Sequence, residues 1–338
     1  MSAEKQSCVV GGGAFGTALA EVLASNHNTV KVWVRSSRQV EEVQQFRENK
    51  TYLKGHKLHE HIQFTTDIQD AVRDVQIVLL AIPTQFLRSF LSANRSVFPV
   101  GVPIVTCAKG IELTTLQFPY DILTDELPGK YHKYLAALSG PSFAGEVVQK
   151  QPTSVTASAK HPNVAAEVQK LLSSRAHNFR VYTSDDIMGV EVAGAVKNVL
   201  AIASGAFHGL AFGNNSRAII ICRGLAEIAR LSAKLGSDGK CLSGLAGVGD
   251  LLLTCSSELS RNFTVGKKLA LGSSLVDIES TSLTVAEGVA TAKALHELAT
   301  IHDVDMPICK AVYEVLYENK SIHTVMEELA TRPLTSEF

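Results

Sequence analysis

The sequence predicts an α/β fold in which a doubly wound parallel sheet is followed by an all-α C-terminal domain. Two observations support this prediction. Strand-like and helix-like segments alternate in the first half, which is typical of a parallel sheet covered by helices on both faces. From about Asp185 onward the helical period dominates and convincing strands disappear. We therefore expect two domains, residues 1–185 and residues 186–338.

The predicted strands are short apolar or β-branched runs separated by helical segments. Ser7–Val10 is the first, and Thr29–Val34, with the sequence TVKVWV, is the second. Further buried strands are predicted at Ile77–Ile82, Ile104–Cys107 and Leu135–Leu138, and two later ones, Thr153–Ala157 and Phe179–Thr183, should extend the same sheet.

The predicted helices carry apolar residues every three or four positions. The first helix follows the first strand and places Phe15, Leu19, Val22 and Leu23 on one face. In the second half, RAIIICRGLAEIARLSAKLG is typical of a helix ended by Gly236. A second helical segment, VAEGVATAKALHELATIHD, stops before Pro307.

Composition excludes several classes of partner. The chain is 46% hydrophobic and 19% charged, with a formal net charge of -1. It lacks the basic excess that attracts nucleic acid or anionic lipid. We find no apolar run of about 18 residues, the length of a membrane span. The first residues lead at once into a strand and the last four, TSEF, are not a peroxisomal address, so we expect no targeting peptide and a cytoplasmic location.

The six cysteines and eleven histidines predict neither a disulfide framework nor a metal site. The cysteines are scattered and form no C-x-x-C pair, which favours a reduced intracellular chain. The histidines show no metal-ligand spacing, so no metal is expected.

A glycine-rich turn, GGGAFG, separates the first strand from the first helix. Gly11 permits the tight turn, Gly13 allows backbone amides to approach a pyrophosphate, and Gly16 lets the helix pack closely on the strand. The phosphates would lie at the positive N-terminus of the helix. Because the turn is first in the chain and a second strand follows, it predicts a Rossmann-type domain that binds NAD or NADP.

The end of the second strand leaves both nicotinamide cofactors open. An acid at this place would favour NAD by bonding the ribose hydroxyls. The segment VWVRSSRQV instead carries Arg35, which can meet a 2′-phosphate or stack on adenine. We therefore expect NAD or NADP without a preference.

Three loops follow strands at the carboxyl edge of the sheet, where a nicotinamide ring is expected. AIPTQF contains Pro83, CAKGIE contains Lys109, and LSGPSFAGE contains Gly140, Ser142 and Ala144. Lys109 directly follows a buried strand and could meet an anionic substrate. Gly140 and Ser142 could offer a backbone and a hydroxyl donor.

Three segments of the second half also carry candidate residues. GVEVAGAVKNVLAIASG is almost entirely small or apolar, yet it contains Lys197. GLAGVGDLLLTCSS places Asp250 between a glycine-rich turn and an apolar run. SRNFTVGKKL offers Ser260 as a helix cap, with Arg261 and Asn262 in the first turn, which suits a phosphate.

Together these segments, with VAEGVATA, closely resemble the NAD(P)-dependent sn-glycerol-3-phosphate dehydrogenases of the soluble type, in order, over residues of about 7 to 325. The resemblance implies reversible reduction of dihydroxyacetone phosphate to sn-glycerol 3-phosphate, a step that supplies phospholipid precursors. It also implies a Rossmann domain, a helical domain and a homodimer. The matched catalytic residues are Lys197, Lys109, Asp250 and Asn198. The matched substrate contacts are these four with Gly140, Ser142, Thr254, Ser260, Arg261 and Asn262. The matched cofactor contacts are Gly11, Gly13, Ala14, Phe15, Gly16, Arg35, Pro83, Lys109, Ala144, Arg261, Val285 and Glu287.

The resemblance assigns proton transfer to Lys197. A free lysine, with a pKa of about 10.4, is a poor base at neutral pH. Partial burial beside Lys109 and Arg261 should lower that pKa, while Asp250 opposes the shift and is expected to orient the ammonium. Asn198 is expected to hold the reacting oxygen, and Arg261 and Asn262 the phosphate.

Two other functions stay open at this point. A β-hydroxyacid dehydrogenase acting on a carboxylate substrate would also use a lysine–asparagine helix after a Rossmann domain. The segment SRNFTVGKKL, which suits a phosphate dianion, argues for the first function. A non-catalytic nucleotide sensor would leave Lys197 without a role.

Overall fold

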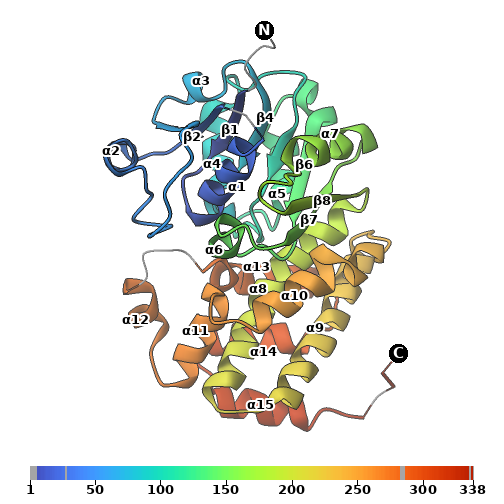
Figure 1. Cartoon of the computed structure of the whole chain (residues 1–338). Coiled ribbons are helices and arrows are strands. Elements are labelled where there is room, and N and C mark those ends of the chain that lie inside the picture. Colours follow the sequence, from blue (N-terminus) through green and yellow to red (C-terminus); the bar gives the residue numbers. More distant parts are fainter. Residues whose placement is uncertain (1–5, 27–28, 282–285, 335, 338) are drawn as a thin grey trace.

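The computed structural model describes residues 6–26, 29–281, 286–334 and 336–337. The chain forms an α/β part that carries the N-terminus and a helical part stacked on one end of it (Figure 1). The last strand ends at Ser184 and the long helix α8 begins at Ile187. Residue 185 remains our proposed domain boundary.

One eight-stranded sheet forms the centre of the α/β part. The strands are β1 (Gln6–Val10), β2 (Thr29–Trp33), β3 (Ile62–Thr65), β4 (Val75–Leu80), β5 (Ile104–Thr106), β6 (Leu135–Ser139), β7 (Thr153–Ser158) and β8 (Phe179–Ser184). Their order is β3-β2-β1-β4-β5-β6-β7-β8, so the chain winds outward in both directions from β1 and β4. This confirms the predicted doubly wound α/β fold.

Two features of the sheet differ from the prediction. The sequence analysis missed β3, because Ile62–Thr65 is only four residues long with polar neighbours. It also expected a wholly parallel sheet, which was wrong: β6 and β7 pair antiparallel, while β7 and β8 pair parallel. The physical reason lies in the connection, whose short helix α6 (Ala144–Val148) packs against α1 instead of crossing the face of the sheet. Parallel neighbours require such a crossover.

Helices cover both faces of the sheet. They are α1 (Ala14–Ala24), α2 (Ser37–Phe46), α3 (Ile68–Ala71), α4 (Thr84–Asn94), α5 (Pro119–Glu126), α6 and α7 (Pro162–Leu172), with a 3₁₀ turn at Gly129–Tyr134. Alternate residues of β1 point into separate cores, Val9 into one and Cys8 and Val10 into the other. This alternation follows from the period of two along a strand.

The helical part contains no strand within the described residues after Ser184. Its helices are α8 (Ile187–Gly209), α9 (Asn214–Lys234), α10 (Asp250–Cys255), α11 (Arg261–Ala270), α12 (Leu275–Ser280), α13 (Glu287–Ile301), α14 (Pro307–Tyr317) and α15 (Ile322–Ala330). A 3₁₀ turn (Lys240–Ser243) and a π-turn (Leu245–Gly249) precede α10. The two helices predicted here are α9, which ends just before Gly236, and α13, which ends before Pro307.

Helix α8 corrects the expectation that no segment is long and apolar enough for a membrane span. Ile187–Gly209 meets that criterion, because Glu191 and Lys197 are its only Asp, Glu, Lys or Arg residues. However, 89% of the qualifying window is buried inside the protein, so α8 is the central core helix. Figure 1 shows α8 leading from the α/β part into the middle of the helical part.

Buried glutamates fasten elements that are far apart in the sequence. Glu191 of α8 accepts a hydrogen bond from the backbone N–H of Tyr120 in α5, at 2.9 Å. Glu287 of α13 accepts one from the N–H of Thr84 in α4, also at 2.9 Å. Each carboxyl oxygen accepts from the first turn of a helix in the α/β part, where backbone N–H groups have no partner within the helix. These two contacts join the two parts of the chain.

Candidate active site

Lys197 lies inside the protein, at the junction of the two parts. Its side chain is buried, and Nζ donates hydrogen bonds to Asp250 Oδ1 at 2.8 Å and to Thr254 Oγ1 at 2.9 Å. Helix α10 supplies both acceptors, four residues apart and therefore on one helical face. The ammonium group thus has two partners on α10 and one remaining N–H.

Asp250 bridges two lysines. Its Oδ2 accepts from Lys109 Nζ at 2.7 Å, while Oδ1 accepts from Lys197. Lys109 follows β5 and also donates to the carbonyl oxygen of Gly140, at 3.2 Å. Gly140 has a φ of +138°, a region that L-residues with side chains rarely adopt. The structure therefore brings together, in one cluster, four residues that the sequence predicted separately: Lys109, Gly140, Lys197 and Asp250.

Burial and charge set the protonation states of this cluster. Burial lowers the pKa of Lys197 to about 8, with Lys109 acting in the same direction and Asp250 in the opposite one. Arg261, which we expected to contribute, is not among the causes of this shift. Burial alone would raise the pKa of Asp250, but the two ammonium groups outweigh it and hold that pKa below its usual range. With both lysines charged, the three side chains carry a net positive charge, which favours an anionic ligand.

Asn198 and Asn262 are bonded within the protein. Asn198 Nδ2 donates to the backbone oxygen of Lys109 at 3.2 Å, and its Oδ1 accepts from Asn262 Nδ2 at 2.9 Å. Asn262 Oδ1 accepts in turn from the N–H of Gly288, at 3.0 Å. The two amides therefore join α8, α11 and α13, and they hold the Lys109 loop. Their contacts with the reacting oxygen and the phosphate stay a prediction.

Helix α11 begins as the sequence predicted. Ser260 is its N-cap, and Oγ accepts from the N–H of Phe263 at 3.3 Å. Arg261, the first residue of the helix, is exposed. Burial raises the pKa of Glu287, and Arg261 is among the groups that oppose this rise, so the guanidinium lies close enough to act on that carboxyl group. Arg261 thus lies near the start of α13.

The glycine-rich turn fits a dinucleotide. Gly11 has a φ of +110°, and a Cβ there would lie 2.5 Å from the carbonyl oxygen of Ala81. A Cβ at Gly16 would lie 2.0 Å from the carbonyl oxygen of Gly11, whereas Gly13 has open space around it. No side chain caps α1, whose first two residues are Ala14 and Phe15. Free backbone N–H groups at a helix N-terminus with an open approach are what a pyrophosphate requires.

The other predicted cofactor residues surround this turn on separate elements. Pro83 is the N-cap of α4, and Ala144 is the first residue of α6, which packs on α1. The Ser142 hydroxyl donates to the carbonyl oxygen of Gly140 at 3.0 Å. Val285 lies outside the described residues.

Arg35 has an aromatic neighbour that the sequence analysis did not single out. Its guanidinium lies 5.8 Å from the ring centroid of Phe86, which is 47% exposed on α4. The sequence signal for this contact was Phe86 itself, a large aromatic residue in AIPTQF, just after a predicted strand.

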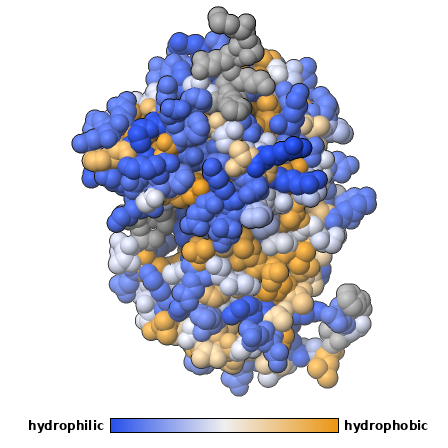
Figure 2. Space-filling model, viewed as in Figure 1, coloured by the Kyte–Doolittle hydropathy of each residue, from blue (hydrophilic) through white to orange (hydrophobic). Residues whose placement is uncertain are grey.

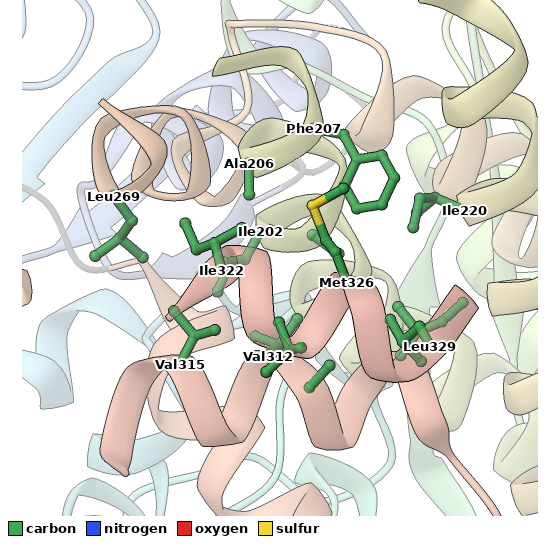
Figure 3. A pocket seen from close by; sticks show the side chains of 14 residues that line it. Ile202, Ala206, Phe207, Ile220, Leu269, Val312, Val315, Ile322, Met326 and Leu329 are labelled. Atoms are coloured by element: carbon green, nitrogen blue, oxygen red, sulfur yellow. The ribbon is translucent and has the colours of Figure 1, made fainter. Parts of the chain in front are cut away.

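Neither a metal site nor an apolar cavity in the helical part offers the described residues another charged site. Among the described residues, no group of three His, Cys, Asp or Glu side chains could hold a metal ion. An apolar cavity of about 40 Å³ lies between α8, α14 and α15. Figure 3 shows only hydrocarbon and one thioether around it, with Ile202, Val312 and Met326 among its lining residues, so it offers nothing to a charged ligand.

A doubly wound sheet that begins with an uncapped glycine-rich turn, together with a buried lysine whose pKa is lowered, is typical of a nicotinamide-dependent dehydrogenase. Residues 6–165 match the N-terminal domain of NAD-dependent glycerol-3-phosphate dehydrogenase, and residues 186–327 match its C-terminal domain. The chain therefore belongs to the NAD-dependent glycerol-3-phosphate dehydrogenase family.

Individual relatives support the assignment to this family. A glycerol-3-phosphate dehydrogenase [NAD(P)+] of Myxococcus xanthus is 47% identical over 98% of both chains. A glycosomal, NAD(+) enzyme of Trypanosoma brucei brucei is 46% identical over 98% of this chain and 95% of its own. The crystal structure of glycerol-3-phosphate dehydrogenase from Coxiella burnetii superposes with a TM-score of 0.91 at 31% identity, covering 97% and 99% of the two chains. These matches confirm the predicted dehydrogenase and its NAD or NADP cofactor, and they do not support the carboxylate alternative.

Proposed function

We propose that this chain catalyses the reversible reduction of dihydroxyacetone phosphate to sn-glycerol 3-phosphate with NADH or NADPH. The observation that supports it best is the buried Lys109–Asp250–Lys197 cluster at the carboxyl edge of the sheet. Each ammonium has three N–H groups and uses two of them within the protein. One donor on each lysine thus remains for substrate oxygens.

Lys197 is the acid and base of the reaction. In the oxidative direction Nζ takes the proton of the C2 hydroxyl, and in the reductive direction it returns that proton to the carbonyl oxygen. A pKa of about 8 keeps both forms populated near neutral pH. The bound nicotinamide ring accepts or supplies the hydride. Asp250 holds Lys197 in place, together with Thr254.

The phosphate is held by positive charge at the junction. Lys109 carries one charge next to Gly140, and Arg261 carries another at the start of α11. Both lie on elements that the Asn198–Asn262 pair connects, so the two charges keep a fixed relation. The KM for dihydroxyacetone phosphate tests this placement, because Arg261→Ala should raise it steeply while the affinity for cofactor changes less.

Turnover of Lys197→Ala tests the assignment directly. Nicotinamide absorbance is followed with dihydroxyacetone phosphate and either NADH or NADPH. Loss of general acid–base catalysis should lower kcat by about 10²- to 10⁴-fold, while the Kd for NADH, measured by fluorescence, stays the same. Lys268→Ala, which removes an exposed lysine of α11, serves as the control and should be fully active. Near-normal kcat in Lys197→Ala would refute the role of this lysine.

We also propose a homodimer that forms through α9 and α10. Two large apolar side chains are prominently exposed here, Ile219 at 58% and Leu252 at 52%. A shallow hollow of about 460 Å³ also lies along α9, with Leu225, Ala229 and Leu242 in its lining. Figure 2 shows this apolar surface as the large orange region over α9 and α10. Contiguous exposed apolar surface of this kind marks an interaction site.

The cytoplasm is our proposed location. All six cysteines are free, as is usual in a reducing compartment. The Trypanosoma brucei brucei relative named above is glycosomal, so fractionation of cells with the enzyme assay as readout is the deciding test.

A further inference from the structure

Two side-chain amides donate hydrogen bonds to the backbone of the glycine-rich turn. The carbonyl oxygen of Gly12 accepts from Gln39 Nε2 of α2 at 2.6 Å and from Asn49 Nδ2 at 2.9 Å. Asn49 lies in the loop after α2. We propose that Asn49 and Gln39 are positioning residues that fix the Gly12–Gly13 peptide so that its N–H faces the pyrophosphate of the cofactor.

Both N–H groups and the oxygen of the Asn49 side-chain amide have hydrogen-bond partners. It is completely buried, and its second N–H donates to Thr17 Oγ1 of α1 at 2.8 Å. Its Oδ1 accepts from Gln39 Nε2 at 3.4 Å, so the two amides also support each other. A buried amide with both N–H groups bonded is held in one orientation. Asn49 therefore ties its loop to the turn and to the second turn of α1.

The geometry of the peptide bond links the hydrogen bonds to the Gly12 oxygen with the direction of the Gly13 N–H. In a trans peptide the C=O and the following N–H point in opposite directions. The Gly12 oxygen points inward to Asn49 and Gln39, so the Gly13 N–H points outward. The space beside Gly13 is open, since a Cβ built on this residue meets nothing within 4 Å. Gly11, by contrast, uses its N–H within the protein, donating to the carbonyl oxygen of Trp33 at 2.9 Å.

Only an N–H donor can fill this role. A carboxylate at position 49 has nearly the same shape as the amide but only accepts hydrogen bonds. It would repel the Gly12 oxygen and remove the restraint on the peptide. The test variants are therefore Asn49→Asp and Gln39→Glu, which change a donor into an acceptor without changing volume. Gln39 is half-buried on α2, so its variant keeps the test valid should the buried site be damaged by the first change.

The experiment compares ADP-ribose, which contains the pyrophosphate, with adenosine, which does not. Calorimetry is used on the full chain. We expect each variant to bind ADP-ribose at least about tenfold more weakly, the effect of losing a hydrogen bond to a charged group, with adenosine affinity within about twofold. Asn94→Asp is the matched control, because Asn94 also donates to a backbone oxygen, that of Phe90, but at the far end of α4. It should bind both ligands normally.

Equal loss for both ligands would show a general structural defect and overturn the positioning role, as would unchanged binding of ADP-ribose. Placement of the dinucleotide at the glycine turn belongs to the proposed function, on which this inference rests. The two are separable: if the wild-type chain itself fails to bind ADP-ribose, the proposed function is overturned together with the role of the amides.

Discussion

Asp250 contacts both lysines of the site and influences the pKa of Lys197. Its carboxylate is buried between Lys109 and Lys197 and is the attractive charge that opposes the lowering of the Lys197 pKa. Without it, two like charges would face each other in a site shielded from water. The position of Asp250 thus keeps Lys197 protonated over part of the neutral range.

The pH dependence follows from this balance. In the wild type, kcat/KM for oxidation of glycerol 3-phosphate should rise with pH through about 8, because the neutral lysine is the base. In the reductive direction it should fall over the same range, because the protonated lysine is the acid. In Asp250→Asn the partner that raises the pKa of Lys197 is gone. The rising limb should then move to lower pH, and the maximal rate should fall by about tenfold or more.

Asp74→Asn is the control for this profile. Asp74 is exposed, lies outside the site and has a positive φ that asparagine also tolerates. Its profile should match the wild type. If the pH at which kcat/KM for oxidation rises in Asp250→Asn is unchanged or higher, the role given to Asp250 is contradicted.

Close contact between α8 and α11 depends on two glycines. A Cβ on Gly205 would lie 1.9 Å from the backbone oxygen of Phe263, and one on Gly266 would lie 1.8 Å from that of Ile202. Because the helices approach so closely, Asn198 and Asn262 can pair at 2.9 Å. The spacing of two elements thus determines a contact that holds the Lys109 loop.

Gly266→Ala should separate these helices. The added methyl group meets backbone, which cannot turn aside, so the free energy of unfolding should fall by at least about 1–3 kcal/mol. Since Arg261 and Asn262 lie on α11, the KM for dihydroxyacetone phosphate should rise as well. Chemical denaturation and steady-state kinetics measure both effects. Gly129→Ala, at an exposed position with nothing within 4 Å of the new methyl group, should change neither. Normal stability in Gly266→Ala would show that the contact is looser than described.

At the scale of the whole molecule, the proposed active site depends on contacts between the two parts of the chain. Lys109 follows strand β5 and Asp250 belongs to the helical part, and Lys109 Nζ lies 2.7 Å from Asp250 Oδ2. The buried Glu191 and Glu287 add links on either side. Burial raises the pKa of Glu191 to about 8, so its carboxyl group keeps its proton in the folded chain at pH values where the unfolded chain has lost it. This contribution to stability is complete below about pH 4.5 and is lost as the pH rises through about 8.

Association of two copies is the prediction at this scale. Ile219→Glu and Leu252→Glu place a charge in the apolar surface over α9 and α10, so a dimer formed there should dissociate. Sedimentation equilibrium should give the mass of two chains for the wild type and of one chain for the variants. Ile301→Glu changes a residue that is 64% exposed at the end of α13 and should leave the dimer intact. A wild-type monomer, or variants that remain dimeric, would remove α9 and α10 from consideration.

Local patterns in the sequence predicted most elements, because strands, caps and glycine turns depend on neighbouring residues. The turn Gly11–Gly16, the cap Ser260 and the apolar helix around Lys197 were all visible in this way. The short strand Ile62–Thr65 was not, since four residues hold too little pattern. The antiparallel pairing of β6 and β7 depends on how α6 packs, which no local pattern records.

The sequence by itself determined the family, the α/β order of elements and the identities of the candidate catalytic residues. Only the tertiary structure decided which of them meet: Lys197 and Asp250 are 53 positions apart, and Lys109 and Asp250 are 141 positions apart. It also decided that Asn198 and Asn262 bond to each other and that Asn49 supports the glycine turn. The physical reason is that hydrogen bonds over such separations depend on how whole helices and strands pack, whereas the residue pattern specifies only each element and its buried face.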